Sequence, residues 1–200
     1  MSEFVAFDIE TKTKYVKGTT KKLDFAIAVV YDSDTRKFHT IWDEEVYELP
    51  EYFQDAQVIV GFNNYGFDNQ ILKDSRVFAK GQWIDFSRKS FDMYYYIYDK
   101  HKIKTKISDL SIPTLNSGKV VIELSPDELY NLGEFDTLED YCRQDCNLTR
   151  GIYEYGLDNN SVYYEDRSKS IHMLDVDWEQ YKALRWRRDY LDGKSGFEWR

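Results

Sequence analysis

The sequence has few of the residues that build disulfides and zinc sites. It contains two cysteines and three histidines among 200 residues. Cys142 and Cys146 lie one helical turn apart, and the histidines His39, His101 and His172 are scattered, so a zinc site would lack nearby ligands. We expect two reduced cysteines that serve as small core residues, and ordinary roles for the histidines.

Long apolar runs and a leader are also lacking. The chain has no stretch of about 18 consecutive apolar residues. Its start, Met1-Ser2-Glu3, lacks the basic and apolar regions of a signal peptide. We therefore expect no contact with a membrane and a cytoplasmic location, which would be the host cytoplasm if the source is a virus.

The chain does not carry a net positive charge. Its formal net charge of −9 argues against a protein that coats nucleic acid nonspecifically. An enzyme that holds one end of a strand stays open, because local charge matters more than the total. The lysine-rich stretches 12–22 and 100–106 are either solvated loops or phosphate contacts, and the sequence favours neither. A hydrophobic content of 42% is enough for a sizeable core, and the length suits one domain with an appendage.

The stretch from Glu3 to Thr11 is an apolar run with two carboxylates at its far end. Such a run is typical of a strand that is covered on both faces of a sheet, so we expect it to be central. Asp8 and Glu10 are two residues apart on this strand and project to the same face. Two like charges there cost free energy unless something neutralises them, and a divalent cation with oxygen ligands is the obvious candidate.

The chain after this strand predicts further strands and helices. The runs 23–31 and 37–42 are joined by a polar turn and predict an antiparallel meander with the first strand. Ser125-Pro126-Asp127-Glu128 is a helix start with a serine cap and a proline at the first position. The other expected elements are a helix at 46–56, a buried strand at 58–62, a loop opening into a helix at 63–72, a strand running into a helix at 90–98, and a long helix from Thr137.

Two further acids stand on the apolar faces of expected helices. Asp68 shares a face with Ile71 and Leu72 by the i, i+3, i+4 spacing. Asp145 lies in an apolar stripe of the last long helix, which consists of Leu138, Tyr141, Cys142, Asp145, Leu148 and Ile152.

The sequence thus predicts four inward carboxylates, two from a strand end and one from each of two helices. A two-metal phosphodiester hydrolase requires such a set, because its metal ions stabilise both the attacking and the leaving oxygen. Magnesium suits the site, since it binds through a few carboxylates and keeps waters and phosphate oxygens as its other ligands. Tyr141 lies one turn before Asp145 and is placed to hydrogen-bond the attacking water.

Three motifs in this order resemble a known family. They are Phe7-Asp8-Ile9-Glu10-Thr11, Asn63-x-x-x-Phe67-Asp68 and Tyr141-x-x-x-Asp145. They resemble the exonuclease motifs of the DEDD (DnaQ-like) 3′→5′ exonuclease superfamily. The tyrosine points to its tyrosine branch, which includes RNase D and the proofreading domains of family A and B DNA polymerases. The amino-acid sequence of the first motif is most similar to that of family B proofreading domains.

The resemblance covers roughly residues 3 to 156 and implies a fold and a set of roles. The implied fold is α/β and RNase H-like, a mixed sheet with helices on both faces. Asp8, Glu10 and Asp145 would bind one Mg²⁺ or Mn²⁺, and Asp8 with Asp68 would hold a second. Thr11, Asn63 and Phe67 would contact the terminal nucleotide at the 3′ end of a single strand, with DNA favoured over RNA.

Each motif is short, and the chain contains chance matches to all three. They are Asp43-Glu44-Glu45, Asn131 to Asp136, and Tyr95 to Asp99. Context separates them from the ordered motifs, since Asp43 ends an alternating run and Asn131 follows a helix. Two other functions stay open: an exoribonuclease of the RNase D type, and a catalytically silent interaction module on the same scaffold.

The resemblance ends near residue 157, which divides the chain into an expected exonuclease domain, 1–157, and a C-terminal extension, 158–200. The stretch 158–161 reads as a break. We expect the extension to be helical, basic and aromatic, with an amphipathic helix at 178–191. That helix would bind a single strand by stacking and phosphate contacts, or pack on the core, or bind a polymerase or another replication or repair partner.

Overall fold

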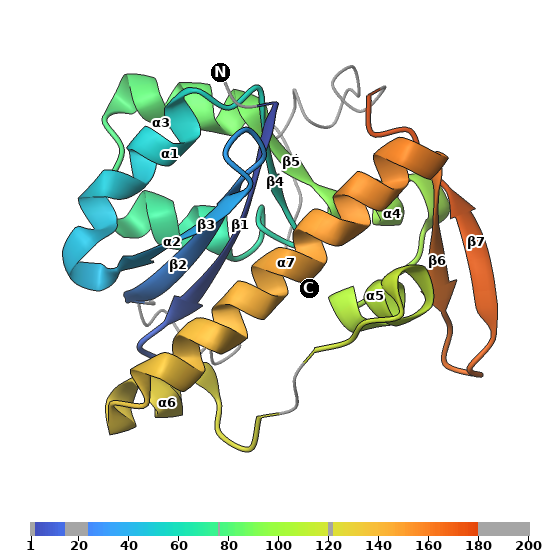
Figure 1. The fold of residues 1–200 in the computed structure, drawn as a ribbon. Helices are drawn as coiled ribbons and strands as arrows, with labels where there is room; N and C mark the ends of the chain where they lie inside the picture. The colour runs from blue at the N-terminus through green and yellow to red at the C-terminus, as the bar shows by residue number, and fades with distance from the viewer. Residues whose placement is uncertain (1–2, 15–23, 76, 120–121, 180–200) are drawn as a thin grey trace.

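The computed structural model describes residues 3–14, 24–75, 77–119 and 122–179. Five strands form one mixed sheet in the order β3-β2-β1-β4-β5 (Figure 1). β1, β2 and β3 are antiparallel neighbours, and β4 and β5 run parallel to β1. The meander and the central position predicted for the first strand are both confirmed. The strands are β1 Phe4–Thr11, β2 Phe25–Asp32, β3 Lys37–Trp42, β4 Val58–Gly61 and β5 Ser90–Asp92.

Both faces of the sheet are covered, because alternate residues of β1 enter two separate apolar clusters. Phe4 and Ala6 belong to one cluster. Val5, Phe7 and Ile9 belong to the other. The predicted α/β architecture, a mixed sheet with helices on both faces, is therefore confirmed. By the same alternation, Asp8 and Glu10 face the side of Phe4 and Ala6.

Short helices cover the face of Val5, Phe7 and Ile9 (Figure 1). They are the 3₁₀-helix η1 Asp43–Glu48, α1 Leu49–Gln54, α2 Asp68–Ser75 and α3 Lys80–Lys89. The single helix expected at 46–56 is wrong in detail, because a 3₁₀ turn precedes α1 and Pro50 occupies an opening position of that helix. Proline is tolerated there, since the first turn of a helix needs no backbone donor.

A long helix, α7 Phe135–Asn159, crosses the opposite face of the sheet (Figure 1). Cys142 and Cys146 lie on its buried side, where both are free and fully buried. The sulfur of Cys142 lies 3.5 Å from the Asp8 carbonyl oxygen, and that of Cys146 lies 3.4 Å from the Ala6 carbonyl oxygen. The prediction of small, reduced core residues is confirmed, and these thin side chains let α7 approach β1 closely. The remaining helices on this side are α4 Met93–His101, α5 Ile107–Leu115 and α6 Pro126–Leu132.

The described part of the C-terminal extension is a hairpin. α7 ends at Asn159, and Asn160 adopts a left-handed conformation with φ of 50° that turns the chain into the next strand. β6 Ser161–Glu165 and β7 Ile171–Asp175 then pair antiparallel beside α5 (Figure 1). α7 ends within the stretch 158–161, where a break was expected, but the helical expectation is wrong for these two strands. Most of the amphipathic helix expected at 178–191 lies outside the described residues.

This hairpin packs on the same core as the sheet. Val162, Leu174 and Val176 are buried in the cluster that contains Phe4 and α7. Trp178 follows the hairpin and is only 4% exposed. Its indole nitrogen donates a hydrogen bond to the Tyr153 carbonyl oxygen at 3.1 Å. The boundary expected after residue 157 therefore falls inside α7, and the described part of the extension shares the core.

A glycine admits the Trp178 ring to α7. A side chain at Gly156 would place its Cβ only 2.1 Å from the indole nitrogen, so this position of the helix has to stay bare. The ring also packs edge-on against Phe91 and Tyr96. The extension is thereby fixed to α7, β5 and α4.

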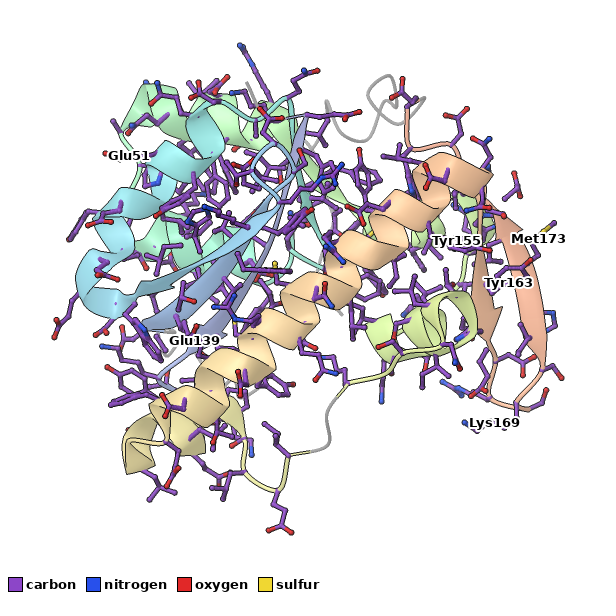
Figure 2. The ribbon with its side chains drawn as sticks, in the orientation of Figure 1. Glu51, Glu139, Tyr155, Tyr163, Lys169 and Met173 are labelled. Carbon is purple, nitrogen blue, oxygen red and sulfur yellow. The ribbon has the colours of Figure 1, made fainter. Side chains whose placement is uncertain are left out.

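We predict that Trp178→Ala lowers the free energy of unfolding by about 3–5 kcal/mol, because a large buried aromatic side chain leaves a cavity. Denaturant unfolding monitored by circular dichroism measures the change. Met173→Ala is the control, since Met173 is 64% exposed on the same hairpin (Figure 2). Equal, small effects of both substitutions would show that the extension does not stabilise the core.

Candidate active site

The end of β1 and the middle of α7 bring three acids together. Asp8 and Glu10 project from β1 toward α7, and Asp145 projects from α7 toward β1. One oxygen from each of these three carboxylates lies within 4.8 Å of the others. Asp145 is 5% exposed, and the two strand acids are half-buried. The structure therefore brings together three of the four acids predicted as metal ligands.

The fourth acid, Asp68, lies at the first position of α2 beside the same strand. β4 pairs with β1 only as far as Ala6, so beyond that point no strand of the described residues pairs with this edge of β1. The Asp68 carboxylate takes that place, and its Oδ1 accepts a hydrogen bond from the Ile9 backbone N–H at 3.0 Å. Asp68 is thus fixed next to the three-acid group, although it does not belong to the group within 4.8 Å.

Burial and mutual repulsion raise the pKa values of these acids. Burial is the largest cause at Asp8, where the charges of Asp145, Glu10 and Asp68 add to it and raise the pKa well above its usual range. Burial and the charge of Asp145 raise the pKa of Glu10 to about 8. Burial raises the pKa of Asp68 to about 7. A cation placed among the oxygens of these acids would offset their repulsion and stabilise their ionised forms.

A lysine that the motifs do not include supplies one cation. Lys119 forms an ion pair with Asp145, and its Nζ lies 3.5 Å from the Tyr141 hydroxyl. Burial opposes the ammonium charge, but the Asp145 carboxylate outweighs it and raises the pKa of Lys119 above its usual value. Asp145 Oδ1 is buried and has no hydrogen-bond partner among the described residues. One oxygen of Asp145 is therefore neutralised by Lys119, and the other is left for a further ligand.

Sequence reasoning missed Lys119, yet the sequence carries a signal. It is the single charged residue between Leu110 and Ile122. A lone charge in an otherwise uncharged stretch needs a partner if the stretch packs on the protein. That signal indicates a buried counter-charge without saying which acid it meets.

Tyr141 lies where the sequence placed it, one turn before Asp145 on α7 and half-buried. Burial, followed by the charge of Asp145, raises the pKa of its phenol to about 12. The hydroxyl is therefore protonated at neutral pH and able to donate a hydrogen bond. The Lys119 ammonium lies 5.4 Å from the centre of the Tyr141 ring.

The three residues expected at the terminal nucleotide lie in different surroundings. Thr11 is buried, and its hydroxyl donates to the Thr13 carbonyl oxygen at 2.8 Å. Phe67 packs, partly buried, against the cluster beneath α1 to α3. Asn63 lines a surface hollow of about 480 Å³ together with Lys119, Phe62 and Tyr94. Of the three, Asn63 lines this hollow together with Lys119, and contact of all three with a nucleotide stays a prediction.

A second missed residue, Asp92, holds the loop that leads to Asp68. It ends β5 and is fully buried. Its carboxylate accepts hydrogen bonds from the backbone N–H groups of Asn63, Tyr65 and Tyr95 at 2.9 to 3.2 Å. Asn63 has φ of 64°, a left-handed conformation that asparagine tolerates better than most residues. Burial raises the pKa of Asp92 to about 7, although each of these hydrogen bonds lowers it.

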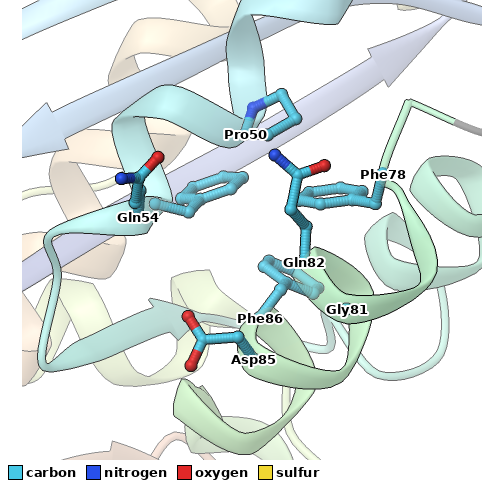
Figure 3. Close-up of a pocket in the computed structure, with 8 residues that line it drawn as sticks. Pro50, Gln54, Phe78, Gly81, Gln82, Asp85 and Phe86 are labelled. Atoms are coloured by element: carbon cyan, nitrogen blue, oxygen red, sulfur yellow. The ribbon is translucent and has the colours of Figure 1, made fainter.

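A separate apolar hollow lies away from these acids, on the other face of the sheet. It has a volume of about 260 Å³ between α1 and α3, and the rings of Phe53, Phe78 and Phe86 line it (Figure 3). Asp85 is the one ionisable residue in its lining. The hollow therefore offers packing surface rather than a set of reactive groups.

No model of a protein family matches this chain, and no curated protein matches it. Solved structures do. One is the family B DNA polymerase from the hyperthermophilic archaeon Pyrobaculum calidifontis, with a TM-score of 0.56 and 18% sequence identity. The match covers 78% of this chain and 25% of the polymerase chain.

At 18% identity the likeness shows the fold alone, and this chain spans about a quarter of that polymerase. The fold expected from the sequence, a mixed sheet between helices of RNase H-like type, agrees with it. Among the described residues, no helix combines the length and apolar character needed to cross a bilayer.

The raised pKa values predict how stability depends on pH without metal. The folded state keeps Glu10 protonated up to about pH 8, whereas the usual pKa of a glutamate side chain is 4.5. Folding therefore takes up protons between these values, and stability is lost as the pH rises through this window. In chelator, we expect the melting temperature to fall from about pH 5 to about pH 8, and Glu10→Gln to make this fall shallower.

Circular dichroism melting at several pH values measures this dependence. Glu51→Gln is the control, since Glu51 is exposed on α1, away from the acids (Figure 2). Added Mg²⁺ should raise the wild-type melting temperature most at high pH, because ionised carboxylates bind it. A wild-type melting temperature that stays level across this range would contradict the repulsion inferred for the group.

Proposed function

We propose that this protein is a metal-dependent 3′→5′ exonuclease that hydrolyses single-stranded nucleic acid, with DNA favoured over RNA. One observation carries the proposal. Asp8 and Glu10 at the end of a central strand meet Asp145 of α7 within 4.8 Å, and Asp68 is tied to the same strand. The fold shared with a family B DNA polymerase supports it at the coarser level of an enzyme that acts on nucleic acid.

The donor set fits two Mg²⁺ or Mn²⁺ ions. All four candidate ligands are carboxylates, and these hard cations prefer oxygen. The unpartnered Asp145 Oδ1 and the raised pKa of Asp8 both indicate a site that gains from added positive charge. When bound, such ions activate a water and stabilise the charge on the oxygens of the phosphodiester.

The remaining residues of the site bind and orient. The protonated Tyr141 hydroxyl can hold the attacking water beside Asp145, one turn farther along α7. Lys119 neutralises Asp145 and also lines the hollow next to Asn63, so its ammonium group can contact a phosphate there. The hollow is large enough for one nucleotide, and the rings of Phe62 and Tyr94 offer apolar surface to a base.

Degradation of matched DNA and RNA strands labelled at the 5′ end tests the proposal. We expect shortening from the 3′ end, release of 5′-mononucleotides, a requirement for Mg²⁺ or Mn²⁺, and loss of activity in chelator and in Asp8→Ala. Faster cleavage of RNA would favour the exoribonuclease alternative. No cleavage of either strand by the folded protein would favour the silent interaction module. Consumption of a 3′-blocked strand would show that the polarity is wrong.

Tyr141→Phe separates water orientation from packing. We expect kcat to fall roughly 10- to 100-fold, because misplaced reactants lose this much rate. Affinity for Mg²⁺, measured by thermal stabilisation, should change little, since the hydroxyl is not a ligand. Tyr155→Phe is the control. It removes a tyrosine hydroxyl near the other end of α7 and should leave kcat unchanged (Figure 2). An unchanged kcat in Tyr141→Phe would assign Tyr141 to core packing.

The biological context of this activity also stays a proposal. A cytoplasmic location and a polymerase or other replication or repair partner fit an enzyme that trims 3′ ends. The part of the extension proposed to bind such a partner begins near Trp178 and lies mostly outside the described residues.

A further inference from the structure

A second surface hollow continues the one beside the acids. It has a volume of about 450 Å³ and lies between the start of α5 and the hairpin β6–β7. Thr105 and Lys106 line both hollows, so the two meet at this short stretch before α5. The two hollows therefore adjoin at Lys106, one reaching Lys119, which pairs with Asp145, and the other reaching the hairpin.

The second hollow combines positive charge with an aromatic ring. Lys104, Lys106, Arg167 and Lys169 line it, and so does Tyr164. Lys169 lies at the turn of the hairpin (Figure 2). Basic side chains interleaved with aromatic rings are how proteins bind single strands, through phosphate contacts and base stacking.

The acids of this hollow already have partners within the protein. Glu165 pairs with Lys169 at 2.6 Å. Asp166 accepts hydrogen bonds from Ser168 and lies 2.8 Å from the His172 ring. Asp109 accepts a hydrogen bond from the Lys106 backbone N–H at 2.9 Å. These carboxylates are engaged by their neighbours.

Three cations are left to face solvent. Lys104, Lys106 and Arg167 are exposed and form no ion pair with any described residue. The Lys104 ammonium lies 6.0 Å from the centre of the Tyr98 ring, and this ring stacks on Tyr94, which lines the first hollow. On a chain with a net charge of −9, the lining of this hollow has four cations and three acids and therefore a small positive net charge.

Hydrogen bonds and an ion pair hold the hairpin in place beside α5, so the hollow is formed without a bound strand. Two hydrogen bonds join Thr114 and Tyr163. The Thr114 hydroxyl donates to the Tyr163 carbonyl oxygen, and the same hydroxyl accepts a hydrogen bond from the Tyr163 backbone N–H at 2.9 Å. Lys100 pairs with Asp175 at 2.6 Å at the other end of the hairpin. A preformed site loses less conformational entropy on binding.

We propose that the hollow between α5 and the β6–β7 hairpin binds the phosphodiester backbone of the single strand upstream of its terminal nucleotide. Lys104 and Arg167 contact phosphates, Tyr164 offers its ring to a base, and Lys106 joins this segment to the hollow beside the acids. The inference rests on the proposed function for the direction of the strand. It adds a length requirement: strands that reach the hairpin bind more tightly than strands that end before it.

Fluorescence anisotropy in chelator, where no strand is consumed, tests this with oligothymidylates of about 4 and about 16 nucleotides. The variant is Lys104→Gln combined with Arg167→Gln. Each lost phosphate contact lowers the salt slope of log K by about 0.7, so the slope for the long strand should fall by about 1.4. We compare the affinity for the long strand with that for the short strand. Between 1 M and about 0.1 M salt, the smaller slope makes the variant lose roughly 25-fold in this ratio relative to the wild type.

The control removes the same charges elsewhere. Lys73→Gln with Arg88→Gln neutralises one exposed lysine and one exposed arginine on α2 and α3, across the sheet. It should keep both the affinity ratio and the salt slope, and so should Lys104→Arg with Arg167→Lys, which retains the charges. Equal losses in the control and the test variant, or no loss in either, would overturn the proposal. So would competition by polyglutamate at equal charge, which would indicate an acidic peptide as the ligand.

Failure of this inference differs from failure of the proposed function. A protein that binds long strands through the hairpin but cleaves none would keep the inference and lose the exonuclease. A protein that trims 3′ ends with equal affinity for both lengths would keep the exonuclease and overturn the inference.

Discussion

Repulsion among Asp8, Glu10 and Asp145 is the constraint on which the rest of this structure depends. Like charges within 4.8 Å of one another, largely withdrawn from water, oppose folding unless the scaffold holds them and a cation compensates them. The scaffold is rigid where it is needed: β1 is the central strand of the sheet, and the cysteines of α7 pack directly on its backbone. Lys119 compensates part of the charge. Burial and the remaining repulsion raise the pKa values of Asp8 and Glu10, so a cation placed among these oxygens would be favourable.

The connection from β4 to α2 obeys a related constraint. Asp68 has to reach the unpaired edge of β1, so the chain must turn sharply after β4. Gly61 permits the turn, because a Cβ there would lie 2.6 Å from the Asn64 side chain. Asp92 then fixes the loop through three backbone N–H groups, and Asn63 adopts its left-handed conformation within it. A buried carboxylate that touches none of the three clustered acids thereby determines where the fourth acid lies.

The sequence was sufficient for features that local patterns encode. The continuous apolar run of β1, the spacing of Asp8 and Glu10, and the apolar stripe around Asp145 predicted both the central strand and the facing acids. Lys119 was missed because it meets Asp145 across 26 residues of chain, with no periodic pattern to relate them. The hairpin was mistaken for helix because the prediction relied on the aromatic and basic composition of the whole extension. The two short strand patterns on either side of the polar turn at 166–170 were given too little weight. Local patterns specify elements, whereas long-range charge pairs emerge only when the elements pack.

The total charge of the chain and the charge along the proposed strand path have opposite signs, and this difference can contribute to specificity. A net charge of −9 repels nucleic acid from most of the surface. Four cationic and three acidic side chains line the hollow beside the hairpin, so its net charge is positive. On the proposed path, a strand would pass Lys106 and end at Lys119, next to the carboxylates. If the strand follows the proposed path, the negative net charge disfavours binding elsewhere, and the path would select strands whose end can enter the site.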